Sequence, residues 1–424
     1  MKKRHIVLGF LAVLSIITYL DRVCIGVAGP RIQDELGLSS EQWGWVLSVF
    51  ILSYGVFEIP SGALGDRYGH RRVLMRIVVW WSIFTSLTGA AWNYATLLTT
   101  RLLFGAGEAG AWPNVAGSTG RWFPPQERAR AQGVIWAASR VGGAISPWLV
   151  VPLMATVGWR GTFYIFGGIG VVWAIAWFGW YRDHPSQQPG ITAQELAEIG
   201  AAGEAREAAA VPWKKLFRSP RLWLIMAMYW TYVWGSMFYL TWFPTYLVKG
   251  RGLTESEMGK YAALPFILGT IGNLVGGAWC DRLSRRYGLS LGRRLVGSTC
   301  LFVSALFLVA TALTTGKISG VILLGVGFGV MDGMLPAAWA MCLDVGGRYS
   351  GAVTGAMNSA GQAGGFVCTL LFGYLVQASG DYNRPIFVIA AMVMISAWLF
   401  WKIDAARPLI DEAAAPQTLL APCA

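Results

Sequence analysis

Long apolar stretches without a charged residue recur along the whole chain, and they limit most strongly what it can fold into. Charge-free runs lie at 5–20, 77–100, 141–159, 161–181, 222–248, 295–316, 349–380 and 385–401. A helix needs roughly 20 mostly apolar residues to cross a bilayer. Charged residues make up only 13% of the chain, whereas a soluble protein carries about 25%. The chain is therefore expected to be an integral membrane protein.

Together with the intervening runs that carry one or two charges, these stretches predict twelve membrane-spanning helices. The predicted spans lie near 6–29, 43–65, 73–92, 96–120, 128–153, 159–181, 221–248, 257–280, 293–314, 318–343, 350–378 and 384–402. The longest loop divides them six and six. We therefore expect an all-α integral membrane fold of two six-helix bundles.

This division predicts four segments. They are an N-terminal bundle over 1–181, a cytoplasmic linker over 182–220, a C-terminal bundle over 221–403 and a disordered tail over 404–424. In the linker, Thr192 stands three residues before Glu195. This spacing is typical of a residue that caps the start of a helix, so a short surface helix is expected there.

The basic residues predict the orientation in the membrane. Of the 34 Lys and Arg residues, 24 fall at the two termini and in the loops on the same side, and seven fall in the opposite loops. Because cytoplasmic loops collect Lys and Arg, both termini are expected in the cytoplasm. The same rule accounts for the net charge of +12 without a nucleic-acid partner. The chain has no N-x-[ST] sequence, which fits a bacterial inner membrane.

An internal repeat relates the two halves. Gly62–Arg67 follows the second predicted span and Gly277–Arg282 follows the eighth, and their aspartates are 215 positions apart. Pro113 and Pro336, in the fourth and tenth spans, are 223 apart. A six-span unit has therefore been duplicated. Repeats of this kind place the substrate site between the halves, near the middle of the membrane.

Four ionisable residues within predicted spans are the main functional candidates. Asp21 and Arg22 lie in the first span, and Arg101 and Glu108 lie in the fourth. Arg101 and Glu108 are seven residues apart, which places them two turns apart on one helix face. Charges inside a membrane are costly and generally functional. The four residues predict either a structural network of buried charges or a site that couples protons to an anion.

Other kinds of chemistry find little support. The six Cys are scattered without metal spacing, and the three His lie at predicted loops or termini. We therefore expect neither an enzyme nor a metal site, and no cofactor besides the proton as coupling ion.

Gly62–Arg72 contains the most specific local motif, with Asp66 near a helix end and an Arg cluster after it. It resembles the signature loop of the major facilitator superfamily, which steadies one end-state of alternating access. The resemblance implies the superfamily's fold and a charge latch on the cytoplasmic side. The implied gating residues are Asp66, Arg67, Arg71, Arg72, Asp281 and Arg282.

Further strings carry a narrower resemblance over essentially the whole chain. They are Thr18–Arg22, Arg101–Asn114, Gly158–Phe163, Asp183–Pro185 and Thr241–Leu247. In order and spacing they resemble the anion:cation symporter family, which includes carriers of hexuronates, galactonate, glucarate and aromatic acids. The resemblance implies that Asp21 and Glu108 bind the coupled proton. It also implies that Arg22 and Arg101 bind the substrate anion.

The resemblance also implies polar and aromatic contacts to the substrate. Tyr54 matches the family's pocket tyrosine, and Trp339 and Asn358 match contact positions of the C-terminal half. Tyr19 and Tyr232 are looser matches.

Three positions depart from the family pattern. Arg140, beside Ser139, stands where related sugar-acid carriers have an amide, and Glu58 stands where a Gln is more usual. Asp332 falls one residue from the repeat-equivalent of Glu108. A second Arg could suit a dicarboxylate, with Ser139 and Arg140 as substrate contacts. Alternatively, Arg140 pairs with Glu58 or Asp332, and a pair with Asp332 would bridge the two halves as a gate.

These observations predict a proton-coupled symporter of a small organic anion. Sugar acids such as hexuronates, aldonates or aldarates are the first candidates for its substrate. Uptake of an aromatic or other carboxylic acid, and exchange of drugs or anions, are the alternatives. The expected partners are the substrate and the lipid bilayer, and the protein is expected to be a monomer.

Overall fold

The computed structural model describes residues 2–200, 212–346, 350–407 and 409, and all regular structure among them is helical. The first half of the chain contributes α1 (Lys3–Leu36), α2 (Ser40–Tyr68), α3 (His70–Gly89), α4 (Tyr94–Glu108), α5 (Ala111–Trp122) and α6 (Pro125–Trp180). The second half contributes α9 (Pro220–Thr241), α10 (Phe243–Thr245), the π-helical turn η2 (Tyr246–Gly250), α11 (Glu255–Tyr261), α12 (Leu264–Tyr287), α13 (Leu289–Leu313), α14 (Lys317–Asp332), α15 (Leu335–Gly346), α16 (Ser350–Ser379) and α17 (Arg384–Lys402).

The helices correspond to the twelve predicted spans. By length and composition, seven helical segments of the described chain are apolar enough to cross a membrane. Helices α4 and α5 together form the fourth span, and α14 and α15 form the tenth. Helix α6 holds the fifth and sixth spans, which meet at Gly158 with a φ of 71°. A positive φ is open mainly to glycine, and it turns the chain back into the membrane here.

Several helices extend beyond the predicted spans. Among them, α2 and α12 continue past the predicted ends at 65 and 280 to Tyr68 and Tyr287, so both copies of the repeated motif lie within helices. The hydropathy pattern stops where the charges begin, but the backbone stays helical until Gly69 and Gly288. Both glycines have a φ of 86°. The motif is therefore helical at its start and turns only at its glycine.

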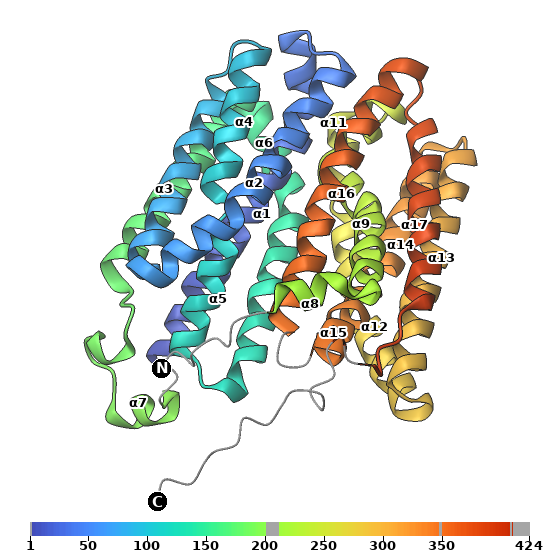
Figure 1. The fold of residues 1–424 in the computed structure, drawn as a ribbon. Coiled ribbons are helices and arrows are strands. Elements are labelled where there is room, and N and C mark those ends of the chain that lie inside the picture. The colour runs from blue at the N-terminus through green and yellow to red at the C-terminus, as the bar shows by residue number, and fades with distance from the viewer. Residues whose placement is uncertain (1, 201–211, 347–349, 408, 410–424) are drawn as a thin grey trace, which may run out of the picture.

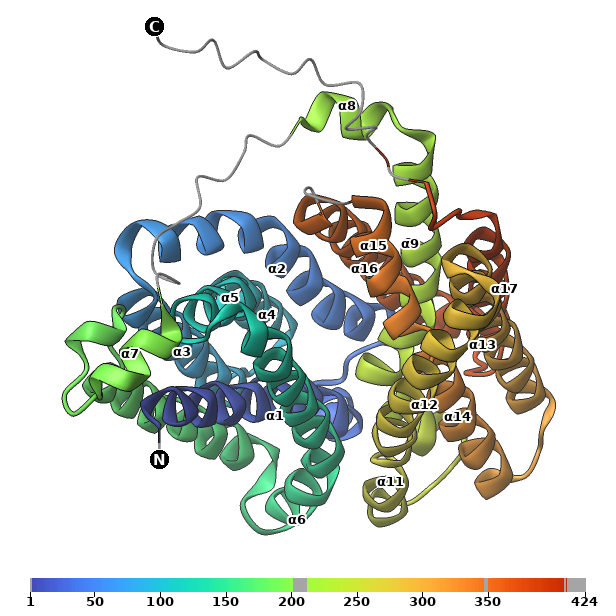
Figure 2. The same ribbon diagram turned by 90° about the horizontal axis from the view of Figure 1, so that it is seen from below.

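The two groups of helices lie side by side (Figure 1), and the view from below separates them clearly (Figure 2). They join at the end of the molecule opposite the termini. There, Arg31 of α1 pairs with Glu255 of α11 at 2.5 Å, and Lys249 pairs with Asp34 at 2.7 Å. Gly44 of α2 lies against the backbone of α16 at Gly373. These contacts close that end of the molecule.

The linker carries short helices, which include α7 (Ala193–Ile199) and α8 (Trp213–Arg218). The predicted cap is confirmed, because Thr192 accepts a hydrogen bond from the Glu195 backbone N–H at 3.2 Å. The buried Glu195 carboxylate accepts from the backbone N–H groups of Lys3 and Arg4 at 3.0 and 2.9 Å. These donors belong to the first turn of α1, where N–H groups have no partner within the helix. The linker helix therefore caps the first membrane span.

Ion pairs hold α7 against α1. Arg4 pairs with Glu198 of α7 and Glu127 of α6, each at 3.0 Å. Lys2 donates a hydrogen bond to Glu198 and thereby lowers the pKa of that carboxyl. Predicted disorder over 404–424 falls largely on 408 and 410–424, which lie outside the described residues.

Loss of the Glu195 cap is expected to loosen the start of α1. Glu195→Ala leaves two N–H groups of the first turn without a partner, and a lost cap costs about 1–2 kcal/mol. We expect faster amide hydrogen exchange at Lys3 and Arg4 and a lower melting temperature. Gln194→Ala, on the exposed face of the same helix, is the control. Equal exchange in both variants would contradict the capping role.

Candidate substrate and proton site

Two of the charged residues of α1, Asp21 and Arg22, lie in the middle of that helix. Asp21 is buried and Arg22 is partly buried. Helix α1 packs along α6, with Gly142 of α6 against the backbone of Ile16. A side chain at Gly142 would force these helices apart, so this glycine sets how closely Arg140 of α6 approaches α1.

Arg22 and Glu108 form a buried ion pair between α1 and α4. The Arg22 Nε lies 2.6 Å from the Glu108 Oε1, and Glu108 is almost completely buried. The Arg22 guanidinium also lies over the Tyr54 ring, 4.7 Å from its centroid. Such charge-assisted hydrogen bonds are strong, and they hold both side chains in place. The predicted neighbourhood of Arg22, Glu108 and Tyr54 is therefore present.

Arg101 and Asp21 complete the cluster without such a partner. Arg101 is buried, and its guanidinium lies over the rings of Phe50 and Phe104 at 4.9 and 4.6 Å. Asp21 lies within electrostatic range of Arg101 and Glu108, and near Trp81. Neither Asp21 oxygen makes a hydrogen bond of normal distance and angle among the described residues, although the Trp81 indole N–H is a nearby donor. Asp21 therefore has no charged partner of its own in the described part of the chain, and burying an unpaired charge is costly.

A second buried ion pair joins the two halves of the molecule. Arg140 Nη2 of α6 lies 3.1 Å from Asp332 Oδ2, at the end of α14. The Asp332 side chain is completely buried, whereas 20% of the Arg140 side chain is exposed. Tyr232 of α9 donates to Asp332 Oδ1 at 3.4 Å, and Asn273 of α12 donates to Oδ2 at 3.2 Å. Of the two protein carboxylates foreseen as partners of Arg140, Asp332 is the one that pairs with it in this structure.

Close glycine packing places Asn273 beside Asp332. Gly272 and Gly276 of α12 face the backbone of Gly329 in α14 and of Gly333 just after it, where a Cβ atom would clash with a carbonyl oxygen. Sequence analysis missed Asn273. The available signal was its position as a lone amide in the Gly-rich stretch 269–277.

The family model of the Major Facilitator Superfamily matches residues 11–369. The chain belongs to the major facilitator superfamily. As a member, it is a multi-pass membrane transporter and not an enzyme.

Similar proteins of this superfamily carry organic anions. A probable sulfoacetate transporter of Cupriavidus necator is 36% identical over 400 residues, covering 93% of each chain. The hexuronate transporter of Bacillus subtilis is 32% identical over 412 residues, covering 96% of this chain and 95% of its own. These relatives belong to the group of carriers that the sequence strings indicated.

A solved structure confirms the fold. It is the crystal structure of a bacterial homologue of the human lysosomal transporter Spinster, in an inward-facing and unoccupied conformation. The match has a TM-score of 0.78 at 18% identity and covers 94% of this chain and 96% of that one. The two six-helix bundles of the major facilitator fold are thus present.

Two other predicted contact residues lie on helices of the second half. Trp339 of α15 is 37% exposed, and its ring centroid lies 6.5 Å from that of Trp136 on α6. Trp136 in turn stacks on Trp112 of α5 at 4.6 Å. Asn358 lies partly buried on α16. Trp339 therefore contacts the opposite half, close to the level of Arg140.

The remaining candidates divide between the two ion pairs. Tyr19 lies within electrostatic range of both Arg22 and Arg140. Glu58 lies near Arg22. Ser139 is fully buried, and its hydroxyl donates a hydrogen bond to the backbone carbonyl of Ile135 in the same helix, 3.2 Å away. The Ser139 side chain therefore does not join either ion pair.

The superfamily's signature loop is placed in both halves. In the first, Arg71 donates to the carbonyl of Phe178 at 2.9 Å, and its backbone N–H donates to Asp183 at 3.0 Å. Arg67 lies over the Tyr68 ring. Arg72 lies in the first turn of α3, and Asp66 lies in α2 with its side chain outside the described part of the structure.

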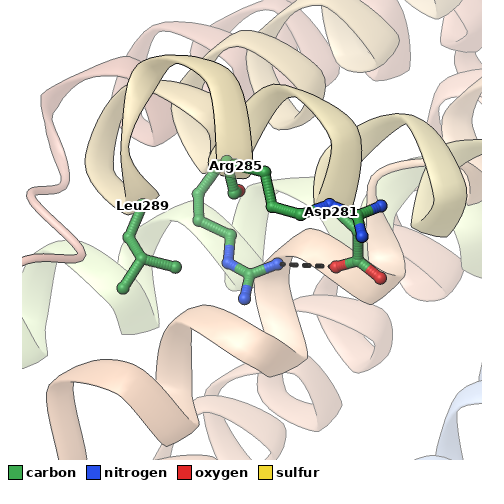
Figure 3. A pocket seen from close by; sticks show the side chains of 5 residues that line it. Asp281, Arg285 and Leu289 are labelled. Atoms are coloured by element: carbon green, nitrogen blue, oxygen red, sulfur yellow. Dashed lines mark ion pairs between the residues drawn. The ribbon is translucent and has the colours of Figure 1, made fainter.

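Figure 3 shows the pocket beside the second copy of the motif, with Asp281, Arg285 and Leu289 labelled along its lining. Asp281 is paired there with Arg293 at 3.8 Å. Arg293 also pairs with Asp344 of α15 at 3.1 Å. Arg282 is exposed on α12.

Proposed function

We propose that this transporter is a proton-coupled symporter of a small organic anion, with sugar acids as the first substrates to test. The observation that supports this most is the buried Arg22–Glu108 pair with Asp21 and Arg101 beside it. In this buried cluster the two guanidiniums can bind an anion and the two carboxyls can bind protons. Each of these ligands would replace a contact that the charged side chains make with one another in the empty site.

The coupling follows from competition for Arg22. A substrate carboxylate binds a guanidinium through two parallel hydrogen bonds. When it takes Arg22, the buried Glu108 loses its partner and becomes far easier to protonate. Asp21, which is buried and has no ion-pair partner among the described residues, is the second proton acceptor. The loaded site then carries substrate and proton together, and the empty site restores the internal pair.

The relatives support this substrate class, since they include carriers of hexuronate, galactonate and sulfoacetate. We propose a bacterial inner membrane with both termini in the cytoplasm, following the distribution of Lys and Arg. In that orientation the contacts between Arg31 and Glu255 close the periplasmic end. The conformation described would then be open toward the cytoplasm, and Asp66, Arg71, Arg72, Arg67, Asp281 and Arg282 would steady the opposite state.

Transport in proteoliposomes tests the proposal. Purified protein is reconstituted with an acidic outside and an alkaline inside, and uptake of labelled hexuronates, aldonates, aldarates and sulfoacetate is measured. We expect at least one of these anions to accumulate, and a protonophore to abolish the accumulation. Transport of none of them, or accumulation that the protonophore leaves unchanged, would contradict proton-coupled anion symport.

Substitution of Arg22 or Arg101 by lysine is expected to weaken substrate binding. Lysine keeps the charge but lacks the planar fork that binds a carboxylate through two hydrogen bonds. We expect Arg22→Lys and Arg101→Lys each to lower affinity about tenfold or more, which corresponds to roughly 1.4 kcal/mol. Titration of intrinsic tryptophan fluorescence with substrate measures this. Arg218→Lys, at an exposed Arg of the linker helix α8, is the control. Unchanged affinity in both Arg22→Lys and Arg101→Lys would place the anion elsewhere.

A further inference from the structure

A third arginine lies near the proposed site, and the symport mechanism above does not use it. Tyr19 interacts electrostatically with the guanidiniums of both Arg22 and Arg140. Arg140 differs from Arg22 in its partner, because Asp332 belongs to the other half of the molecule. Two cationic positions, each with its own carboxylate, therefore share one neighbour.

The two ends of the second ion pair are held unequally. Asp332 is completely buried and accepts hydrogen bonds from Tyr232 and Asn273, which both belong to its own half. Arg140 is one-fifth exposed and has a long, flexible side chain. If the pair opens, Asp332 keeps two of its three polar partners, whereas Arg140 needs another anion. The pair is therefore built to release Arg140 and keep Asp332 in place.

We propose that the substrate is a dianion with two acidic groups, one bound at Arg22 and Arg101 and the second bound at Arg140 in exchange for Asp332. Aldarates and short sulfocarboxylates are the classes of dianion to test. This inference rests on the proposed function and narrows it. A monoanion would leave the Arg140–Asp332 pair intact, because it has no second group that can replace the Asp332 carboxylate.

The exchange makes Arg140 a specificity-determining residue. Breaking a buried ion pair is strongly unfavourable unless a new partner compensates the freed charge. The second acidic group supplies that partner. A substrate with a hydroxyl at the same place offers only a neutral hydrogen bond, which is weaker than a charge-assisted one. The site thus discriminates by charge at one end of the substrate.

Two pairs of compounds test this, each matched except for one acidic group. Galactarate and galactonate have the same carbon chain with two carboxylates and one, and sulfoacetate and acetate differ by a sulfonate. Titration of intrinsic tryptophan fluorescence with each of the four compounds gives the apparent affinities without requiring transport. In the wild type we expect the dianion of at least one pair to bind about tenfold or more tightly than its monoanion.

Variants of the pair separate this idea from a general role in folding. Arg140→Gln is expected to weaken dianion binding about tenfold and to change monoanion binding less than twofold. Asp332→Asn removes the competing charge and keeps a polar side chain for Tyr232 and Asn273, so dianion binding is expected to tighten severalfold. Arg22→Lys is the matched control, because it should weaken both kinds of anion.

Each possible result of these measurements either supports or overturns the inference. Equal affinity for both members of each pair in the wild type would overturn the inference, and so would equal loss of both anions in Arg140→Gln. In these cases the wild-type protein would still transport the monoanion, so the proposed symport would still stand. Absence of transport for every anion would overturn the proposed function and this inference together. Melting temperatures of the variants separate a misfolded protein from a changed specificity, and the tightening in Asp332→Asn cannot come from misfolding.

Discussion

Asp21→Asn and Glu108→Gln are each expected to abolish substrate accumulation driven by a pH gradient. Each substitution removes a proton-binding carboxyl and keeps the size and polarity of the side chain. Glu108→Gln also leaves Arg22 without its 2.6 Å partner. Exchange of labelled for unlabelled substrate moves no net proton, and we expect it to survive in one of the two variants.

The measurement is uptake into proteoliposomes with and without the pH gradient, alongside counterflow without one. Glu41→Gln is the control, because it makes the same change at the start of α2, outside the buried cluster. Full accumulation in both cluster variants would rule out Asp21 and Glu108 as the coupling groups. Loss of exchange in both would instead indicate damage to substrate binding.

Removing one member of the Arg140–Asp332 pair is expected to be more damaging than removing both. Arg140→Ala and Asp332→Ala each strand a buried charge, at a cost of about 3–5 kcal/mol. The double variant strands none, so it should recover a good part of the thermal stability. A double-mutant cycle over the four proteins gives the coupling between the two residues directly.

For a monoanion, transport by the four proteins should show the same pattern as their thermal stability, whereas for a dianion it should not. Since the pair bridges the halves, it must open and close as they rock, and either single variant is expected to lose transport. The double variant should regain part of the monoanion transport but not transport of a dianion, which needs Arg140. Absence of any recovery in stability or transport would show that the pair is not a coupled unit.

Much of the fold could be predicted from the sequence, because membrane spans are long and their apolar character is continuous. The buried charges could be found for the same reason, since Asp21 or Arg140 stands out against apolar neighbours. The turn at Gly158 falls, as predicted, between the spans expected at 128–153 and 159–181. The break between Asp332 and Leu335 was harder to predict, because it interrupts a stretch of continuous apolar character within the tenth span.

The pairing of charges could be narrowed but not decided from the sequence. Glu58 and Asp332 were equally available to Arg140 until the helices were placed, and glycine contacts between α12 and α14 then brought Asn273 to Asp332. Ser139 stands next to Arg140 in sequence, yet one helical step of about 100° turns it away toward its own backbone. Contacts between helices distant in sequence depend on such packing, which no local pattern encodes.

The cap that Glu195 gives to α1 also sets an order of events during biosynthesis. The first span leaves the ribosome long before residue 195, yet its initial N–H groups at Lys3 and Arg4 find their acceptor only in the linker. Nascent chains that end shortly before α7 therefore insert with an uncapped first helix, and chains that extend beyond Ile199 can complete it. The linker thus acts as the last piece of the first half to be made, finishing a helix whose synthesis began the protein.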